Sequence, residues 1–311
     1  MKVALAALLA LLALPSAVVA EPVAQSVDVV FVKKKNVYVY DAVTAATTRL
    51  TGRRDAVGDV ALAPDGKWAA YTASVSRGTD IRVVALDGSG VRDVTPWVSP
   101  TLGPLHTHVE PGWLSPNRLT YVDDQRAASK AVGRLQAVDL RTGAHGAVGG
   151  LPRALSSFVL EPVRVSPAGV AYMTLVHVGR GSECEATEDL WLWHGQATRL
   201  SRTPQAWESP LDVEPRLPVL GLRGRFVSGP HSGGCSFGKT TVAYEIRAFA
   251  ARSNRRLVSF PATTSYSQPM GAWSPDGSKL AVVTGGGRLT VLDLGTRKAT
   301  QVATGVTAVD W

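Results

Sequence analysis

The sequence predicts an all-β protein built as a six-bladed β-propeller. A hairpin pattern, in which an apolar strand, a Pro-Asp-Gly turn and a second apolar strand follow one another, has clear copies at 60–71 and 272–283. Pro presets the backbone angle of such a turn, Asp caps it and Gly adopts the positive φ. Units of four strands recur about every 40 to 55 residues without helical periodicity, which is typical of propeller blades.

Each predicted unit continues with a third strand that ends in a turn and with a short fourth strand. The third strands are predicted at 81–88, 135–143, 190–195 and 289–295. Short fourth strands follow them, for example at 91–95 and 197–201. The complete units are therefore predicted at 55–97, 106–150, 155–203, 207–263 and 267–304.

The two ends of the chain supply a sixth unit. Residues 28–51 match the second, third and fourth strands of a unit, and 306–311 match a first strand, because Trp311 takes the position of Trp273 just before the turn. Pairing of the C-terminal strand with the N-terminal blade would close the ring and remove two exposed sheet edges. We therefore expect a single propeller domain over 28–311, with an irregular sandwich of two sheets as the alternative.

The first 20 residues have the pattern of a secretory signal peptide. Lys2 precedes an apolar run at 3–14, and the small residues at 18–20 predict cleavage after Ala20. The run of about 12 residues is short for a bilayer span, which needs about 20, and an uncleaved anchor is the alternative. We expect a periplasmic or secreted protein with a short segment at 21–27 and no membrane span after cleavage.

The 311-residue chain is basic, with 33 Lys and Arg against 25 Asp and Glu and a formal net charge of +8. The basic residues are scattered, as at Arg53-Arg54 and Arg255-Arg256, rather than striped along a helix, so nucleic acid is not an expected partner. Outside the cytoplasm, a basic surface could meet anionic glycans, lipid headgroups or an acidic protein. We expect a monomer that binds an envelope or extracellular protein or glycan.

The string Trp273-Ser274-Pro275-Asp276-Gly277, followed by a strand that ends Leu292-Asp293-Leu294-Gly295, resembles the WD-repeat-like unit of the TolB propeller family. The resemblance is strong at 267–304 and 57–97 and weak at 207–263. It implies a six-bladed extracytoplasmic propeller that binds a partner. The family also has an N-terminal α/β domain, for which we expect no counterpart, because the first predicted blade begins about 8 residues after the signal.

The chain has 2 cysteines, Cys184 and Cys235, in long predicted loops at 178–189 and 229–241. These loops join the second and third strands of adjacent blades on one face, so in an oxidising compartment the pair predicts a disulfide bond. Two free thiols and a metal site are the alternatives. The segment 233–240 also fits the P-loop and G-x-S-x-G spacings, but a strand rather than a helix is predicted after it, which favours a Gly-rich surface loop.

A Glu-Pro step recurs where the first strand of three consecutive blades begins, and its glutamates are Glu110, Glu161 and Glu214. At equivalent positions near the central channel, three carboxylates repel one another unless a cation, an arginine or water compensates them. Solvation, or pairing with arginines such as Arg164 and Arg216, is the favoured interpretation. Ca²⁺ or another divalent cation is the alternative, and no other cofactor is expected.

His106 and His108 lie just upstream of Glu110 on a segment expected to be extended. Such a pair points both imidazoles to one side, so it could begin a transition-metal site or hold a general base, and a solvated loop pair is the alternative. Side chains from the fifth and sixth blades are expected at a comparable depth. The binding site predicted at the channel mouth comprises His106, His108, Glu110, Glu161, Asp212, Glu214, Tyr266 and Gln268.

Two classes of function fit this pattern. A non-catalytic binding or scaffold module for a protein or glycan ligand in the cell envelope is favoured, because the sequence has no catalytic triad, no carboxylate pair of fixed geometry and no complete metal motif. The alternative is an envelope lyase or hydrolase with a metal-assisted site at the channel mouth. No catalytic residue is predicted.

Overall fold

The structure is a computed structural model of the chain. It describes residues 28–76, 78–95, 106–127, 130–149, 151, 163–177, 186–201, 207–213, 217–228, 241–250, 253–261 and 268–311. Every regular secondary-structure element in these residues is a β-strand, which confirms the all-β prediction. Within these residues no helix is long and apolar enough to cross a membrane.

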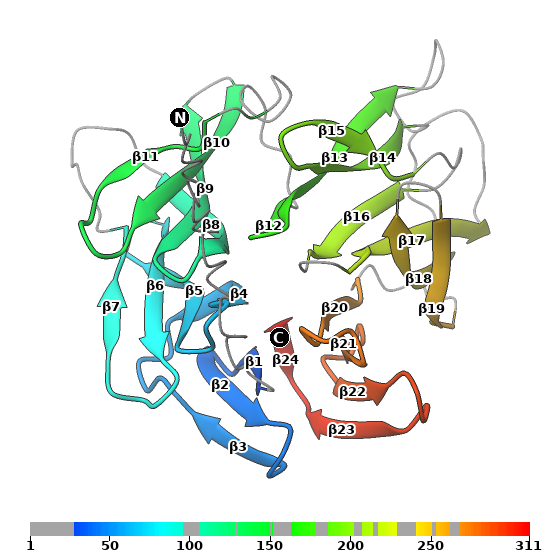
Figure 1. Ribbon diagram of the computed structural model, residues 1–311, viewed down its shortest axis with the longest axis horizontal. Coiled ribbons are helices and arrows are strands. Elements are labelled where there is room, and N and C mark those ends of the chain that lie inside the picture. Colours follow the sequence, from blue (N-terminus) through cyan, green and yellow to red (C-terminus); the bar gives the residue numbers. More distant parts are fainter. Residues whose placement is uncertain are drawn as a thin grey trace, which may run out of the picture.

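The strands form sheets arranged around a central axis, so the predicted propeller architecture is confirmed (Figure 1). Four of the sheets have four antiparallel strands each. One contains β24 (Val306–Asp310), β1 (Asp28–Lys33), β2 (Asn36–Asp41) and β3 (Ala46–Arg49). The others contain β12 (Val163–Ser166), β13 (Gly169–His177), β14 (Ala186–Trp193) and β15 (Ala197–Arg199); β16 (Trp207–Asp212), β17 (Val219–Ser228), β18 (Thr241–Ala250) and β19 (Ser253–Ser259); and β20 (Met270–Trp273), β21 (Lys279–Val283), β22 (Leu289–Asp293) and β23 (Ala299–Ala303).

The fifth sheet has eight strands. They are β4 (Ala56–Leu62), β5 (Trp68–Val75), β6 (Gly78–Ala85), β7 (Val91–Asp93), β8 (His106–Ser115), β9 (Arg118–Ala127), β10 (Lys130–Asp139) and β11 (His145–Ala147). β6 and β8 pair in parallel, Gly78 with His106 and Thr79 with Thr107. The sequence places 55–97 and 106–150 in separate blades, whereas this short parallel ladder joins two four-strand meanders into one sheet.

The first and last strands lie in the same sheet. β24 pairs antiparallel with β1, with Val30 opposite Asp310 and Val32 opposite Ala308. The side chains of Val30, Val32 and Ala308 are buried in one apolar cluster that also reaches β4 and β5. The two ends of the described chain therefore stabilise each other through backbone hydrogen bonds and apolar contacts.

The Pro-Asp-Gly hairpins form as the sequence predicts. Gly66 and Gly277 have φ angles of +66° and +69°, which a residue with a Cβ rarely adopts. Asp65 Oδ1 accepts a hydrogen bond from the backbone N–H of Lys67 at 3.2 Å. Asp276 accepts the equivalent bond from the N–H of Ser278 at 3.0 Å. The turns between β4 and β5 and between β20 and β21 thus share one local chemistry.

The core lies between neighbouring sheets. Tyr71 and Val84 of β5 and β6 are buried against Val37 of β2. On the opposite side of the central axis, Leu220 of β17 packs in the same cluster as Leu280 of β21. Burial of these side chains contributes about 1.5 to 3 kcal/mol each relative to exposure, so contacts between sheets hold the blades together.

The turn between β1 and β2 has an unusual backbone. Lys34 and Lys35 are its two central residues, between the paired Lys33 and Asn36, and their φ angles are +48° and +62°. Such a turn is normally built from Asn-Gly, because a residue with a Cβ is disfavoured in this conformation by roughly 1 to 2 kcal/mol. The Lys-Lys turn is therefore locally strained.

Gly112 allows β8 to approach β12 closely. A Cβ added to Gly112 would lie 2.8 Å from the Cβ of Val165 and 2.9 Å from the carbonyl oxygen of Val165. We predict that Gly112→Ala lowers the free energy of unfolding by about 1 to 3 kcal/mol, because the backbone of one strand must move. Urea denaturation measures this change. The control Gly146→Ala, where a Cβ meets nothing within 4 Å, should stay within about 0.5 kcal/mol, and equal losses in both variants would contradict the packing argument.

Candidate functional site

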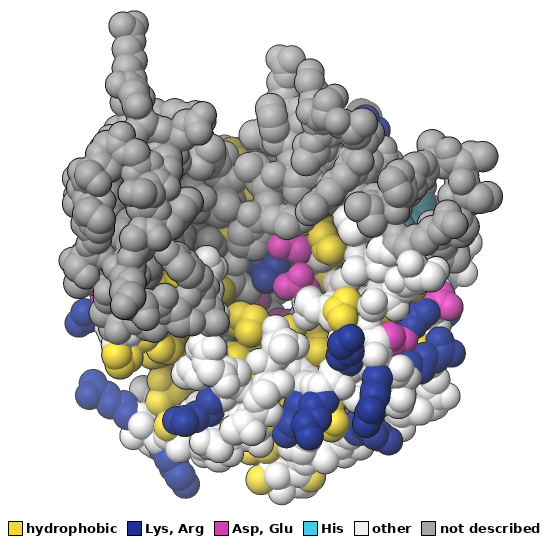
Figure 2. Space-filling model, turned by 180° about the vertical axis from the view of Figure 1, so that it is seen from behind, with side chains coloured by type: hydrophobic (Ala, Val, Ile, Leu, Met, Phe, Trp, Pro, Cys, Tyr) yellow, Lys and Arg dark blue, Asp and Glu magenta, His cyan; other side chains and the backbone are white. Residues whose placement is uncertain are grey.

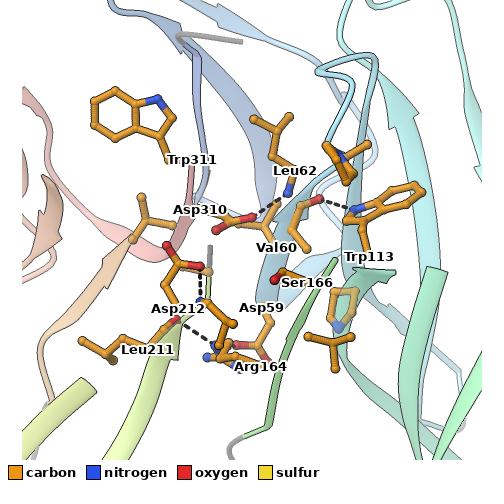
Figure 3. A pocket seen from close by; sticks show the side chains of 18 of the residues that line it. Asp59, Val60, Leu62, Trp113, Arg164, Ser166, Leu211, Asp212, Asp310 and Trp311 are labelled. Carbon is orange, nitrogen blue, oxygen red and sulfur yellow. Dashed lines mark hydrogen bonds and ion pairs between the residues drawn. The ribbon is translucent and has the colours of Figure 1, made fainter. Parts of the chain in front are cut away.

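The first strands of the sheets surround a cavity at the centre of the molecule. Figure 2 shows this hollow from behind, with acidic and basic side chains inside it, and Figure 3 shows it from close by. The cavity has a volume of about 140 Å³ and is lined by residues of β4, β8, β12, β16, β20 and β24 and of the turns that follow them. A volume of this size accommodates one group of a larger ligand.

Arg164 of β12 lies among the charged groups of the cavity. Its Nη2 is 3.3 Å from Asp59 Oδ1, and its Nη1 is 3.6 Å from Glu110 Oε1. Its Nε donates a hydrogen bond to the carbonyl oxygen of Leu211 at 3.1 Å, which connects β12 with β16. Burial lowers the pKa of Arg164, but the charges of Asp59 and Glu110 outweigh that effect and raise it, so the guanidinium stays protonated.

Three carboxylates in and beside the cavity join neighbouring first strands. Each accepts a hydrogen bond from a backbone N–H of an adjacent first strand. The bonds run from Leu62 N to Asp310 Oδ2 (2.7 Å), from Val163 N to Glu110 Oε2 (2.5 Å) and from Trp273 N to Asp212 Oδ2 (2.7 Å). These acidic side chains therefore join the sheets, and those that are ionised form charge-assisted bonds, which are stronger than neutral ones, and give the cavity negative charge.

Tryptophans of two first strands add hydrogen bonds between neighbouring blades. The indole Nε1 of Trp113 in β8 donates to the carbonyl oxygen of Ala61 in β4 at 3.1 Å. The Nε1 of Trp273 in β20 donates to the carbonyl oxygen of Pro218, just before β17, at 3.0 Å. The wall of the cavity is therefore fixed by side-chain to backbone bonds from strand to strand.

Negative groups outnumber the positive one at this centre. Asp59, Glu110, Asp212 and Asp310 all act on Arg164, which is the only Lys or Arg among the described residues that line the cavity. Burial raises the pKa of Asp212 to about 6. Burial, and then the charge of Asp212, raises the pKa of Asp310 to about 8. Asp310 therefore holds a proton at neutral pH, and a cation in the cavity would favour the release of that proton.

Two residues of the sequence-predicted site lie at this centre. Glu110 is 8% exposed and Asp212 is 7% exposed. Glu110 also has a φ of +52°, so its backbone is held in a conformation that is rare for a residue with a Cβ. Arg164 is its ion-pair partner, which corresponds to the arginine pairing favoured from the sequence.

The other predicted residues are placed elsewhere or are not described. Gln268 is exposed and lies just before β20. Glu161, Glu214, Tyr266, Cys184 and Cys235 lie outside the described residues. The convergence of three glutamates and the disulfide bond therefore stay predictions.

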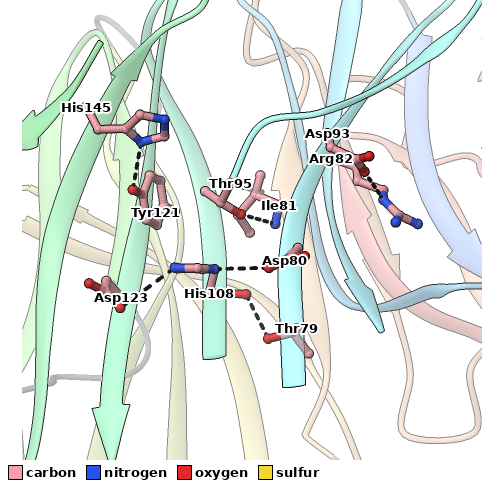
Figure 4. Close-up of polar contacts among 10 residues, drawn as sticks. All are labelled: Thr79, Asp80, Ile81, Arg82, Asp93, Thr95, His108, Tyr121, Asp123 and His145. Carbon is pink, nitrogen blue, oxygen red and sulfur yellow. Dashed lines mark hydrogen bonds and ion pairs between the residues drawn. The ribbon is translucent and has the colours of Figure 1, made fainter. Parts of the chain in front are cut away.

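His108 lies at the seam between β6 and β8 and does not line the central cavity (Figure 4). Its Nδ1 is 3.3 Å from Oδ1 of Asp80 on β6, and its Nε2 is 3.8 Å from Oδ1 of Asp123, its cross-strand partner on β9. Tyr121 packs edge-on against the ring of His108, with centroids 5.2 Å apart. The backbone of His106 belongs to β8, and its side chain lies outside the described set.

The hydroxyl of Tyr121 also lies 3.0 Å from Nδ1 of His145. Burial, and then the charge of His108, lowers the pKa of His145, so His145 is less readily protonated than a free histidine. Among the side chains that the structure describes, no group of three or more His, Cys, Asp or Glu is arranged to hold a metal ion.

Sequence reasoning missed two of the central carboxylates, Asp59 and Asp310. Asp310 ends β24 as Asp212 ends β16, so the register of the repeat was a signal that could have identified it. Asp59 lies at a register shift between Ala56 and Val60, and such a bulge turns a side chain toward a new direction. The sequence has no comparable signal for Asp59.

The sequence matches no protein-family model and no curated protein. Among solved structures, TolB from Acinetobacter baumannii has a TM-score of 0.57 and 15% identity, over 91% of this chain and 66% of the TolB chain. A TolB-type protein from Agrobacterium tumefaciens has a TM-score of 0.51 and 13% identity, over 80% of this chain and 83% of its own. A chain of a nidogen/laminin complex has a TM-score of 0.53 and 10% identity, over 91% of this chain and 97% of its own. The chain therefore has the fold of the TolB-like propellers, and it spans just under two thirds of the Acinetobacter protein.

The raised pKa of Asp310 predicts a pH-dependent stability. The folded protein holds the proton of Asp310 more tightly than the unfolded chain does. Its contribution to the free energy of unfolding is therefore complete below about pH 4 and is lost as the pH rises from there through about 8. Asp310→Asn keeps an acceptor for the N–H of Leu62 and removes the titration. We expect the wild type to lose about 2 kcal/mol or more of unfolding free energy between pH 5 and pH 9, and the variant to lose clearly less. Parallel pH profiles measured by denaturant unfolding would contradict this assignment.

Proposed function

We propose that this protein is a six-bladed β-propeller of the TolB-like type that binds a protein or glycan ligand in the cell envelope and catalyses no reaction. The observation that carries the proposal is the central cavity, in which several buried or half-buried carboxylates surround one guanidinium. A site of this kind recognises charge and has no nucleophile and base held in a reactive pair among its described lining residues. The first 20 residues direct export, and the expected disulfide bond fits that compartment.

Six blades closed into a ring are supported by two features of the strands. The eight-stranded sheet consists of two consecutive meanders, β4–β7 and β8–β11, and each contributes its own first strand to the cavity. The pairing of β24 with β1 joins the two ends of the chain within one blade. With the remaining three sheets, this arrangement makes six units around the cavity, and the closed ring has no free inner edge at its seam.

The charge of the cavity supports a ligand that brings a positive group. Asp212 and Asp310 are buried close enough to each other to disfavour ionisation of both. A lysine or arginine side chain, or the amine of an amino sugar, would offset this repulsion and form charge-assisted hydrogen bonds. The cavity holds such a group while the surrounding face of the propeller contacts the rest of the ligand.

Removal of 306–311 tests closure of the ring. We expect the truncated protein to lose most of its stability, because β1 keeps only β2 as a partner and the cluster around Val30 and Ala308 is opened. Adding a synthetic peptide of sequence 304–311 should restore part of the melting temperature, and a scrambled peptide should not. An unchanged melting temperature after truncation, or equal effects of the two peptides, would contradict closure by this strand.

Thermal shift with small cationic ligands tests the binding site. We expect tri-lysine or an oligomer of glucosamine to raise the melting temperature by about 5 °C at concentrations near 100 times the Kd, and tri-glutamate to have no effect. Asp212→Asn should abolish the shift, because it removes the charge; its one amide oxygen can still accept from the N–H of Trp273, while the bond from the N–H of Val213 is lost. The control Asp87→Asn removes an exposed charge in a turn and should keep the shift. No shift with either cation, or equal shifts in both variants, would contradict the proposal.

A further inference from the structure

A group of basic residues lies where three connections meet on one face of the propeller. We name this group the basic edge; it consists of Lys33, Lys34, Lys35, Arg53, Arg54 and Arg288. The connections are the turn from β1 to β2, the segment from β3 to β4 and the turn from β21 to β22. Lys33 is half-buried, and the other five are exposed.

Backbone contacts place these connections side by side. The N–H of Ala56, which follows the Arg53-Arg54 pair, donates to the carbonyl oxygen of Lys35 at 3.1 Å. On the other side, Val306 is the pairing partner of Lys33, and its N–H donates to the carbonyl oxygen of Gly287 at 2.9 Å. The basic edge is therefore a continuous feature that crosses three sheets. Figure 2 shows Lys and Arg side chains spread over the lower half of the molecule, where β1–β3 and β20–β24 lie.

The positive charges of the basic edge are not neutralised within the described part of the chain. The acid in these connections is Asp55, and its carboxylate is paired with Arg82, which also binds Asp93. None of the six basic residues has an ion-pair partner among the described residues. The carboxylate of Asp55 forms its ion pair with Arg82 instead. An anion that approaches this face would meet six cations and no exposed competing carboxylate in the connections that carry them.

The backbone of the basic edge is strained at the positions of its charges. Lys34, Lys35 and Arg54 all have positive φ angles, between +48° and +62°. Asn or Gly would relieve this strain in each case. Replacing Lys34 and Lys35 by Asn and Gly therefore removes two charges and relieves the strain of the turn at once.

We propose that the basic edge binds an anionic polysaccharide, a linear polymer with repeated carboxylate or sulfate groups. Protein interfaces depend on buried aromatic or apolar anchors, and the basic edge has none. The one exposed large hydrophobic residue among the described residues, Val43, lies in the turn from β2 to β3, at the opposite end of these strands. A polymer with regularly repeated charges needs no such anchor, because it gains its affinity from many simultaneous ion pairs. This surface is separate from the central cavity, so the inference does not depend on the ligand proposed there.

Binding of alginate, a linear polyuronate, to the purified full chain tests this proposal. Lys34→Asn/Lys35→Gly removes two charges and builds a relaxed hairpin turn. We expect its affinity for alginate at low salt to fall about tenfold, while its melting temperature stays equal or rises. The matched control is Arg297→Gly/Lys298→Asn, in the turn from β22 to β23 at the other end of the strands, where Arg297 has a φ of +60°. It also loses two charges and one strained residue, and its affinity should change less than twofold.

Three other results would contradict binding of an anionic polysaccharide at the basic edge. Equal losses in the two double variants would show that net charge alone attracts the polymer. Absence of alginate and dextran sulfate binding at 50 mM salt would overturn the proposal outright. So would binding to phosphatidylglycerol vesicles without binding to either polysaccharide, since the partner would then be a lipid surface. Uncharged dextran serves as the negative control, and loss of alginate binding at high salt is expected.

Discussion

The ion pairs of Arg164 with the acidic residues around it are the interaction on which the centre of this propeller depends. An isolated carboxylate in a buried site is costly, and several of them close together are more costly still. The carboxylates of Asp59 and Glu110 lie 3.3 and 3.6 Å from the guanidinium. The charge of Arg164 also lowers the pKa of Asp212 and of Asp310, against the effect of burial. Arg164 thus allows carboxylates to remain in positions where they bind the backbone of neighbouring strands.

These carboxylates connect the fold to the binding site. The inner strand of a propeller blade is a sheet edge, and its backbone N–H groups need partners. Asp310, Glu110 and Asp212 supply those partners across three of the junctions between blades. A ligand that changes the protonation of Asp310 therefore also changes the bond that joins the last strand to β4. Binding of the proposed ligand would therefore be linked to the stability of the β24–β4 junction through the same atoms.

The sequence predicts the repeated hairpins because their chemistry is local: the Pro-Asp-Gly turn and the alternation of strands depend on residues within one blade. The partners at the centre depend on distant parts of the chain. Asp310 and Leu62 are separated by 248 residues, and Glu110 and Val163 by 53. The Glu-Pro repeat identified Glu110 as a channel carboxylate, and Arg164 was identified only as a nearby pairing arginine. His108 was expected beside Glu110, but it lies at the β6–β8 seam, because the spacing of residues along a strand does not say which neighbouring sheet each side chain faces.

The formal net charge of +8 conceals two regions of opposite sign. The basic residues of the β1–β2, β3–β4 and β21–β22 connections are exposed, whereas the carboxylates of the first strands lie around the axis, with Glu110 and Asp212 buried and Asp59 and Asp310 half-buried. Exposed charges are screened by salt within about 8 Å at physiological ionic strength, and buried charges are screened much less. If the centre binds a positive group as proposed, that binding would persist at salt concentrations that weaken the outer surface. The two proposed sites would then differ in their salt dependence, although they lie on one chain that is basic as a whole.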